Sequence, residues 1–371
     1  MAIVTCGPRS IRQGARTGAR VETAIEGSQA VRALAPCNIA RSVFVDTSGV
    51  PSTDFGITED EREHLVRAAS RLVWLPFDPD LLGEVPEGIE VEQFDGRGER
   101  PSSVDRVELY VPDYTFHPRV VEVIPAMTSL QYVQTLTAGV DHVRPYVDER
   151  VTLCNARGVH DASTAELAVA LTLAALRGLP EFVLAQQEGR WAFAPHRSLA
   201  DRTVLIVGYG SIGEAIERRL TGFECDILRM ARTARDGVAD MAALPELLAA
   251  ADVVMLVVPE TDETVGMVDA QFLARMKDRA LLVNVSRGKV VDSDALLAEL
   301  QQGRLRAALD VTDPEPLPQE HPLWSAPGLL VSPHVGGASS AFWPRAYALV
   351  RDQLARFAAG EPMRNVISGS Y

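Results

Sequence analysis

The sequence predicts an α/β fold with two domains, each built on a parallel β-sheet, and three observations lead to this prediction. The chain has 371 residues, which is enough for two domains on a soft prior of about 150 residues each. Short apolar runs alternate with helix-like segments over residues 71–156 and, more clearly, over residues 203–333, a pattern typical of parallel sheets with crossover helices. Residues 339–360 have the pattern of an amphipathic helix. We expect that helix to return to the first domain, which makes the first domain discontinuous.

Residues 1–70 are predicted to be an N-terminal extension outside both domains. As far as Ala40 they are rich in arginine, contain acids only at Glu22 and Glu26, and lack a sustained apolar periodicity. A disordered tail, a translation start assigned too early and an Arg-rich targeting peptide all remain open. The first two are favoured because glycine and proline oppose the amphipathic helix of a presequence. Thr58 and Glu61 match a capping box, which predicts a short helix through Ser70.

The first domain is predicted to comprise residues 71–160 and 335–371. A long, nearly all-apolar helix is expected over residues 161–179, ended by Gly178 and Pro180. Because a helix that is apolar on most sides must be covered on most sides, we expect it between domains or between subunits, and we predict a homodimer. The strands of the first domain are expected at residues 71–77, 89–94, 107–113, 129–136 and 151–156.

The second domain is predicted over residues 161–334. Its strands are expected at residues 203–208, 226–231, 252–258, 280–285, 307–311 and 328–333. Helices between these strands are expected at Ile212–Leu220, Leu244–Ala251, Ala270–Met276 and Ser293–Gln302. Gly303 follows the last of them as a helix stop.

The composition excludes several classes of function. A net charge of −14 argues against nucleic-acid and anionic-membrane binding, because phosphate groups would be repelled. No apolar run approaches the ~20 residues that a membrane helix requires. Cys6, Cys37, Cys154 and Cys225 occur without a CxxC or Cys/His pair, so we predict no metal site and no disulfide framework. A cytoplasmic location follows as an expectation. Neither of the two lysines lies in a GxxxxGK(S/T) loop, which excludes an ATPase of that type.

A glycine motif in the second domain predicts dinucleotide binding. Gly208, Gly210 and Gly213 form GxGxxG between an apolar strand and a helix. In this arrangement the first glycine permits a tight turn, the second lets the backbone approach pyrophosphate, and the third lets the helix pack on the strand. The helix N-terminus favours the negative charge. The predicted cofactor contacts in and beyond this loop are Gly208, Gly210, Ser211, Ile212, Gly213, Pro259, Thr264 and Val285.

The end of the next strand favours NADP over NAD. An acid about 20 residues beyond the glycines would bind the ribose 2′-hydroxyl of NAD, but residues 230–235 read MARTAR. Arg232 and Arg235 can form charge-assisted bonds to a 2′-phosphate, and Thr233 adds a hydroxyl. The alternative is that both arginines are solvated loop residues.

Three residues that follow consecutive strands form a candidate catalytic set: Arg287, Glu315 and His334. Because ligands of an open parallel sheet bind beyond the carboxyl ends of its strands, we expect them to converge in a cleft between two Rossmann-like or flavodoxin-like domains. A 2-oxo acid needs a planar cation for its carboxylate, which Arg287 supplies, and a proton for its carbonyl oxygen, which His334 supplies. Glu315 can orient the imidazole and favour its protonated form. Asp310 can accept a bond from the nicotinamide carboxamide. Each residue alone is more often structural, but together they predict catalysis.

Several segments carry a family resemblance. In order, they are LTAGVDHV, NARGVHDASTAELAVAL, GYGSIG, VVPETDETVGMV, VNVSRGKVVD, AALDVTDPEPLP, HPLW and VSPHVGG. By these segments the chain, from Arg71 to Ser368, resembles the D-isomer-specific 2-hydroxyacid dehydrogenase family, which includes glyoxylate/hydroxypyruvate reductases, phosphoglycerate dehydrogenases and D-lactate dehydrogenases. The resemblance implies that Arg287 orients the substrate, that Glu315 and His334 form the acid–base pair, and that the backbone amides of Ala138 and Gly139 hold the substrate carboxylate. Residues 231–233 are similar to the Ser-Arg-Ser/Thr of NADP-using members, although Ala231 lacks the serine hydroxyl.

The predicted reaction is hydride transfer from NADPH to a small 2-oxo acid such as glyoxylate or hydroxypyruvate, forming the D-2-hydroxy acid. Formate dehydrogenase relatives carry glutamine where Glu315 stands, so the acid disfavours that branch. Two alternatives remain open. One is a dinucleotide-sensing binding protein of the corepressor kind, which shares the fold, and the other is an NAD-linked dehydrogenase of the phosphoglycerate type. The intact set of Arg287, Glu315 and His334 favours an enzyme over a sensor.

Overall fold

The computed structural model describes residues 70–115 and 117–368. The extension predicted over residues 1–70 lies, except for Ser70, outside the described residues, and so does most of the helix predicted after Thr58. The fold and the site concern the described part of the chain.

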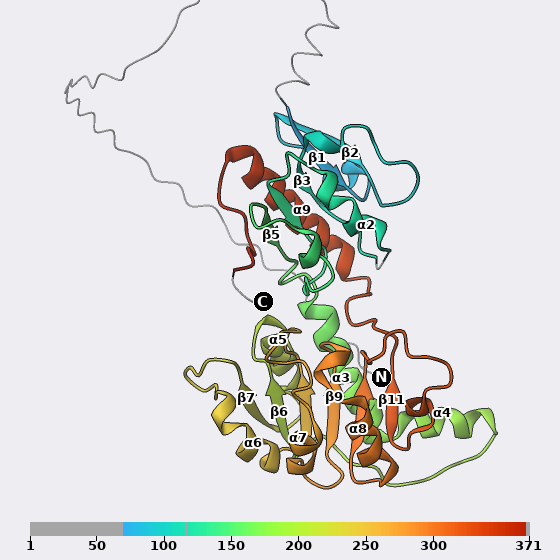
Figure 1. Cartoon of the computed structure of the whole chain (residues 1–371). Helices are drawn as coiled ribbons and strands as arrows, with labels where there is room; N and C mark the ends of the chain where they lie inside the picture. The colour runs from blue at the N-terminus through green and yellow to red at the C-terminus, as the bar shows by residue number, and fades with distance from the viewer. Residues whose placement is uncertain (1–69, 116, 369–371) are drawn as a thin grey trace, which may run out of the picture. The chain divides into compact units, whose positions relative to one another are not determined.

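Five parallel strands form the first sheet, in the order β2-β1-β3-β4-β5 (Figure 1). Along β1 the side chains alternate between the two faces. Leu72 and Trp74 are buried in one core cluster, whereas Val73 and Leu75 are buried in another. Each predicted strand is present and is shorter than its apolar run. The strands are β1 (Arg71–Leu75), β2 (Ile89–Gln93), β3 (Val107–Tyr110), β4 (Tyr132–Gln134) and β5 (Thr152–Cys154).

The C-terminal helix α9 (Phe342–Ala359) packs on one face of this sheet, as predicted, although it is distant in sequence. Gln353 donates a hydrogen bond from Nε2 to Oε1 of Gln134 on β4, at 2.5 Å, and both side chains are buried. The apolar side chains of α9 that join the core with Val73 include Ala346, Val350 and Leu354. The short helices of this part are α2 (Arg119–Glu122) and the 3₁₀ helices Pro79–Leu82, Val104–Arg106, Ile124–Ala126 and Arg144–Tyr146.

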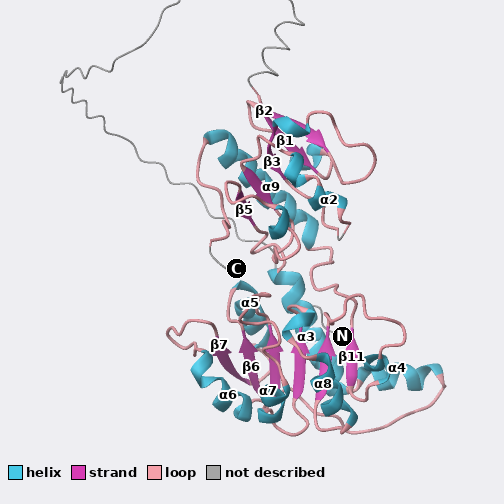
Figure 2. Ribbon diagram, viewed as in Figure 1, coloured by secondary structure: helices cyan, strands magenta, loops and turns pink. Residues whose placement is uncertain are grey.

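Six parallel strands form the second sheet, in the order β11-β10-β9-β8-β6-β7 (Figure 2). Strands β7 and β8 lie on opposite sides of β6, so the strand order reverses there, and ligands of open α/β sheets bind beyond the carboxyl ends at such a reversal. This Rossmann-like sheet confirms the predicted fold class. The strands are β6 (Thr203–Val207), β7 (Asp226–Met230), β8 (Val253–Leu256), β9 (Leu281–Asn284), β10 (Arg306–Leu309) and β11 (Leu329–Val331).

Helices cover both faces of the six-stranded sheet. Leu205 of β6 is buried with Phe272 of α7 and Leu296 of α8, whereas the next residue, Ile206, is buried with Ile216 of α5. Each such fully buried side chain contributes roughly 1.5–3 kcal/mol to the free energy of folding. The helices are α3 (Asp161–Arg177), α4 (Leu179–Gln187), α5 (Ser211–Leu220), α6 (Leu244–Ala250), α7 (Ala270–Arg275) and α8 (Ser293–Gln301), with 3₁₀ helices at Met241–Ala243, Gly288–Val290 and Pro322–Ser325.

The long apolar helix differs in two ways from its prediction. It ends at Arg177, because Gly178 adopts the left-handed conformation with φ 66° and caps it. A further helix, α4, begins directly afterwards with Pro180 in its first turn, a position where proline is tolerated. Helix α3 packs on α5, β9 and β10, so much of its apolar surface is covered within the six-stranded half. No single helix in the described ranges is long and apolar enough to cross a membrane; α3 and α4 reach that length only as a pair bent by 65°.

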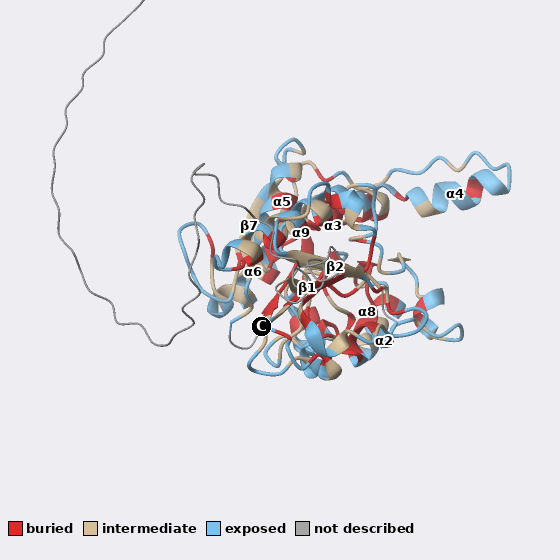
Figure 3. Cartoon of the chain, turned by 90° about the horizontal axis from the view of Figure 1, so that it is seen from above, coloured by how far each residue is buried: buried red, intermediate tan, exposed pale blue. Residues whose placement is uncertain are grey.

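Helix α4 and the loop after it extend away from both sheets and are mostly exposed (Figure 3). We call residues 179–196 the apolar arm. Trp191 and Phe193 are 95% and 90% exposed, which is unusual for large apolar side chains. The other large exposed apolar residues of the arm are Leu179, Phe182, Val183 and Leu184.

Candidate functional site

The glycine loop between β6 and α5 shows why three glycines stand there. Gly208 has φ 101°, and a Cβ on it would lie 2.6 Å from the carbonyl oxygen of Val257, so only glycine makes this turn. A Cβ on Gly213 would lie 2.9 Å from the Gly208 oxygen, so this glycine lets α5 pack against the loop. A Cβ on Gly210 would meet no atom within 4 Å. The backbone at the start of α5 is therefore open to a ligand.

The predicted 2′-phosphate residues follow β7, beside this loop. Arg235 donates a hydrogen bond to the carbonyl oxygen of Tyr209, and its guanidinium lies 5.6 Å from the centre of the Tyr209 ring. Arg232 and Thr233 are exposed in the same turn. We call residues 232–235 the arginine turn. Because Tyr209 is the second residue of the motif GYGSIG, this turn lies against the glycine loop.

An ion-pair network beneath the glycine loop was not predicted. Arg229 on β7 pairs with Glu217 on α5, and the Tyr209 hydroxyl also donates to Glu217. Hydrogen bonding from Arg229 is the largest influence on Glu217 and lowers the pKa of its carboxyl. These residues belong to three different elements, so no local spacing in the sequence could indicate the contact.

His334 and Glu315 form the expected pair. The Nδ1 atom of His334 lies 2.5 Å from Oε1 of Glu315. His334 has φ 51°, a left-handed conformation that is uncommon for a residue other than glycine and costs free energy. Something nearby must therefore hold this backbone in place.

Asp310, at the end of β10, supplies that support. Its Oδ1 accepts hydrogen bonds from the Ser332 hydroxyl at 2.6 Å and from the Val335 amide at 3.0 Å, and its Oδ2 accepts one from the Gly336 amide at 2.8 Å. Its backbone oxygen accepts the His334 amide at 2.7 Å. The carboxyl thus binds both flanks of His334. Its predicted bond to a carboxamide stays a prediction.

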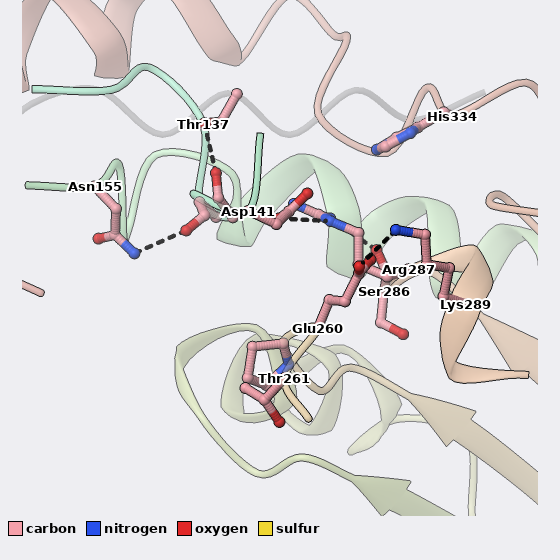
Figure 4. A network of polar contacts seen from close by, with 12 residues as sticks. Thr137, Asp141, Asn155, Glu260, Thr261, Ser286, Arg287, Lys289 and His334 are labelled. Atoms are coloured by element: carbon pink, nitrogen blue, oxygen red, sulfur yellow. Dashed lines mark hydrogen bonds and ion pairs between the residues drawn. The ribbon is translucent and has the colours of Figure 1, made fainter. Parts of the chain in front are cut away.

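Arg287 is held by the loop after β4 in the other sheet (Figure 4). Its Nε donates to Oδ1 of Asp141 at 3.2 Å, and its Nη1 donates to the Ser286 oxygen at 2.8 Å. A Cβ built on Gly139 would lie 1.6 Å from Nη2, so the guanidinium rests on the glycine backbone. Burial raises the pKa of Asp141, but the charge of Arg287 and hydrogen bonds outweigh it, and the pKa lies below its ordinary value.

The predicted substrate amides lie in that same loop. The Ala138 oxygen accepts a hydrogen bond from Asn155 Nδ2 at 2.8 Å, and the Gly139 oxygen accepts one from the Thr137 hydroxyl at 2.7 Å (Figure 4). Both carbonyl groups are thereby fixed, which fixes the planes of the adjoining peptides. The segment that touches Arg287 is therefore rigidly held.

Two histidines near this loop are influenced by the charges of both Arg287 and His334. Burial lowers the pKa of His142, Asp141 opposes that effect, and the charges of Arg287 and His334 lower the pKa further. Burial also lowers the pKa of His160, and Arg287 and His334 contribute again. Glu315 is hydrogen-bonded to His334, and the convergence of Arg287 with this pair on one substrate stays a prediction.

The remaining predicted cofactor residues follow β6, β8 and β9. The Thr264 hydroxyl donates to the Pro259 oxygen at 2.6 Å and accepts from the Thr261 amide, so it closes the loop after β8. Ser211 donates from its hydroxyl to Asp161 Oδ1 at 3.1 Å. Ile212 is half-buried, and Val285 is buried directly after β9. Lys289 and Glu260 form an ion pair at 3.0 Å, which was not predicted and lies beside Arg287 in Figure 4.

Comparison with known proteins identifies close similarity to one family. The model of "D-isomer specific 2-hydroxyacid dehydrogenase, NAD binding domain" matches residues 169–336. The chain is 36% identical to a glyoxylate reductase of Korarchaeum cryptofilum (strain OPF8) over 266 residues, which are 68% of this chain and 80% of that protein.

Solved structures of the same family are also similar to this chain. A D-isomer-specific 2-hydroxyacid dehydrogenase of Xanthobacter autotrophicus Py2, in complex with NADPH and MES, superposes with a TM-score of 0.67 at 29% identity, covering 81% of this chain and 98% of that one. An NADPH-dependent glyoxylate/hydroxypyruvate reductase of Sinorhizobium meliloti, in complex with NADP and malonate, superposes with a TM-score of 0.67 at 29% identity, covering 81% and 97%.

Proposed function

Since this chain belongs to the D-isomer-specific 2-hydroxyacid dehydrogenase family and is therefore an oxidoreductase, we propose that it reduces a small 2-oxo acid such as glyoxylate or hydroxypyruvate to the D-2-hydroxy acid, with NADPH as the hydride donor. The observation that carries the proposal is the His334–Glu315 pair at 2.5 Å, together with Arg287, beyond the carboxyl ends of the six-stranded sheet. Relatives named glyoxylate reductase support the substrate class.

In the proposed reaction, His334 donates the proton. Because Nδ1 is bonded to Glu315, the proton is donated from Nε2 to the carbonyl oxygen of the substrate. Glu315 favours the protonated imidazole and fixes its orientation. When bound, the dihydronicotinamide supplies the hydride that adds to C2. Hydride and proton together convert the carbonyl group to an alcohol.

Substrate orientation falls to Arg287 and to the amides of Ala138 and Gly139. Asp141 occupies the Nε–H of Arg287, and the Ser286 oxygen occupies one N–H of Nη1, which leaves the other N–H groups at the end of the guanidinium for the carboxylate and carbonyl oxygens. Contact of Nη2 with Gly139 brings that end next to the loop whose amides we assign to the carboxylate. A carboxylate between a guanidinium and two amides receives charge-assisted hydrogen bonds.

The preference for NADPH is the finer part of the proposal. The open backbone at Gly210 suits pyrophosphate at the N-terminus of α5, and Arg235 beside Tyr209 suits a 2′-phosphate. Arg232 and Thr233 are exposed in the same turn and available to it. Two similar structures are complexes with NADPH or NADP.

We assign the domains as predicted. Residues 71–160 with 335–371 bind substrate, and residues 161–334 bind the dinucleotide.

We further propose a cytoplasmic homodimer in which the apolar arm is buried against a second copy, because exposed Trp191 and Phe193 would be shielded from water. Sedimentation as a monomer at all concentrations would contradict the dimer.

Turnover on a substrate panel tests the proposed function. We expect NADPH oxidation with glyoxylate and hydroxypyruvate, formation of the D-enantiomer where C2 becomes chiral, and a higher kcat/KM with NADPH than with NADH. Tight cofactor binding without turnover on any 2-oxo acid would instead support a dinucleotide sensor. A preference for NADH with 2-hydroxy acids would support an NAD-linked dehydrogenase.

A further inference from the structure

Tyr114 follows β3 at the carboxyl edge of the five-stranded sheet. Its aromatic ring is held in place by two other rings that pack against it. Its ring centre lies 4.3 Å from that of Phe342 at the start of α9 and 5.6 Å from that of His160 before α3. The His160 ring is itself held by a 2.8 Å contact of Nε2 with the Leu136 oxygen. Tyr114 therefore has little freedom to move away from the site.

The Tyr114 hydroxyl lies against the loop that carries His334. A Cβ on Gly337 would be 2.5 Å from the Tyr114 oxygen and 2.6 Å from Nδ1 of His160. The hydroxyl thus occupies the space where a side chain at 337 would otherwise lie, three residues after His334. A glycine is needed at that position because Tyr114 is there.

The same hydroxyl is close enough to Arg287 and Asp310 to respond to their charges. Burial is the main effect and raises the pKa of Tyr114, Arg287 lowers it, and Asp310 raises it. The hydroxyl is accordingly protonated at neutral pH. In the part of the chain that the structure describes, it makes no hydrogen bond. A half-buried hydroxyl of this kind is available as donor and acceptor to a bound molecule.

We propose that Tyr114 is a specificity residue whose hydroxyl hydrogen-bonds a polar group on C3 of the substrate, so that the site favours 3-hydroxy-2-oxo acids over 2-oxo acids with an apolar C3. The inference rests on the proposed function and deepens it. Arg287 and the loop at Gly139 hold the C1 end, and His334 takes the C2 oxygen. The remaining substituent, on C3, is the one that Tyr114 meets. Phe342 and His160 pack against the ring, so the ring cannot move away to make room for a large group on C3.

A comparison of three acids tests this assignment. Hydroxypyruvate and pyruvate differ by the C3 hydroxyl, and glyoxylate has no C3 at all. Tyr114→Phe removes one hydroxyl and keeps the ring. We expect the ratio of kcat/KM for hydroxypyruvate to that for pyruvate to fall by about tenfold, as for loss of one hydrogen bond, while kcat/KM for glyoxylate changes less than twofold.

A matched control is Tyr347→Phe, since Tyr347 belongs to the same aromatic cluster through Trp343 and Phe342 but is not among the atoms nearest to a Cβ on Gly337. It should leave the ratio unchanged. An unchanged ratio in Tyr114→Phe, or an equal loss with all three acids, overturns the assignment while leaving the reductase intact. A wild-type enzyme that reduces none of the three acids overturns both proposals.

Discussion

The carboxyl edges of the two sheets serve the candidate site in different ways. Beyond the six-stranded sheet lie side chains that can do chemistry, namely His334 with Glu315, and Arg287. Beyond the five-stranded sheet lie groups that position: a backbone held at both carbonyls of Ala138 and Gly139, a carboxylate that fixes Arg287, and the ring of Tyr114. In the proposed reaction the six-stranded half supplies the proton donor together with the orienting cation Arg287, and the five-stranded half supplies only positioning groups. We call the carboxyl edge of the six-stranded sheet the reactive edge and that of the five-stranded sheet the positioning edge.

The largest expected effect is on the reactive edge. His334→Ala removes the proton donor, and we expect kcat to fall by roughly 10²–10⁴-fold, the range for loss of general acid catalysis, with the dissociation constant of NADPH unchanged. Steady-state kinetics and fluorescence titration measure the two quantities.

His321→Asn serves as the control for that variant. It keeps a side-chain acceptor for the amide of Leu323, which His321 Nδ1 now receives at 3.3 Å, and should retain kcat within about threefold. A His334→Ala enzyme with nearly full kcat would remove His334 from the reaction and end the division between reactive and positioning edges.

The reactive edge could be predicted from the sequence, whereas most of the positioning edge could not. Arg287, Glu315 and His334 each follow a clear apolar strand, and their side-chain chemistry indicates a role. Asp141 and Tyr114 act through contacts with Arg287 and Gly337, which lie more than a hundred residues away, and no local period encodes such contacts. Asp310 is intermediate: its place at a strand end was predicted, but its three bonds to the His334 loop follow from a turn conformation that sequence patterns do not reveal.

The apolar arm is a second feature that could not be predicted from the sequence. Gly178 and Pro180 indicate the end of a helix, and α3 does end there, but Pro180 also suits the first turn of a new helix. Local propensity cannot distinguish a stop from a stop followed by a restart. For the same reason, exposed apolar residues in α4 could not be recognised as exposed before the fold was known.

A second prediction tests the positioning edge with a single methyl group. Gly139→Ala places a Cβ 1.6 Å from the present position of Arg287 Nη2 and 2.8 Å from Asp141 Oδ1, so the guanidinium must move. A displacement of about 1 Å in an orienting group can cost on the order of 10²-fold. We expect kcat/KM for the 2-oxo acid to fall by roughly that factor, while KM for NADPH stays within twofold.

Gly222→Ala is the matched control, because a Cβ there meets no atom within 4 Å and the backbone is not left-handed. It should leave both constants unchanged. If Gly139→Ala weakened the binding of NADPH and of substrate equally, the two edges would not act separately.

The smallest expected effect concerns the six-stranded half alone and distinguishes recognition of the 2′-phosphate from recognition of the rest of the dinucleotide. Replacing Arg232 and Arg235 by Ala removes two candidate donors to a 2′-phosphate. Because hydrogen bonds to a charged group contribute about 1.5–3 kcal/mol each when fully formed and less where solvent competes, we expect KM for NADPH to rise by roughly 10- to 30-fold. NADH lacks that phosphate, so its KM should barely change.

Arg218→Ala is the control, since this arginine is exposed on α5 and should affect neither nucleotide. Arg235 also donates to the Tyr209 oxygen, so its loss could disturb the glycine loop and weaken both nucleotides alike. The single variant Arg232→Ala distinguishes these effects, because no hydrogen bond joins Arg232 to the loop among the contacts of the described chain. If Arg232→Ala raises KM for NADPH alone, the arginine turn recognises the 2′-phosphate. If instead the double variant raises KM equally for both nucleotides and Arg232→Ala changes neither, the turn only supports the glycine loop.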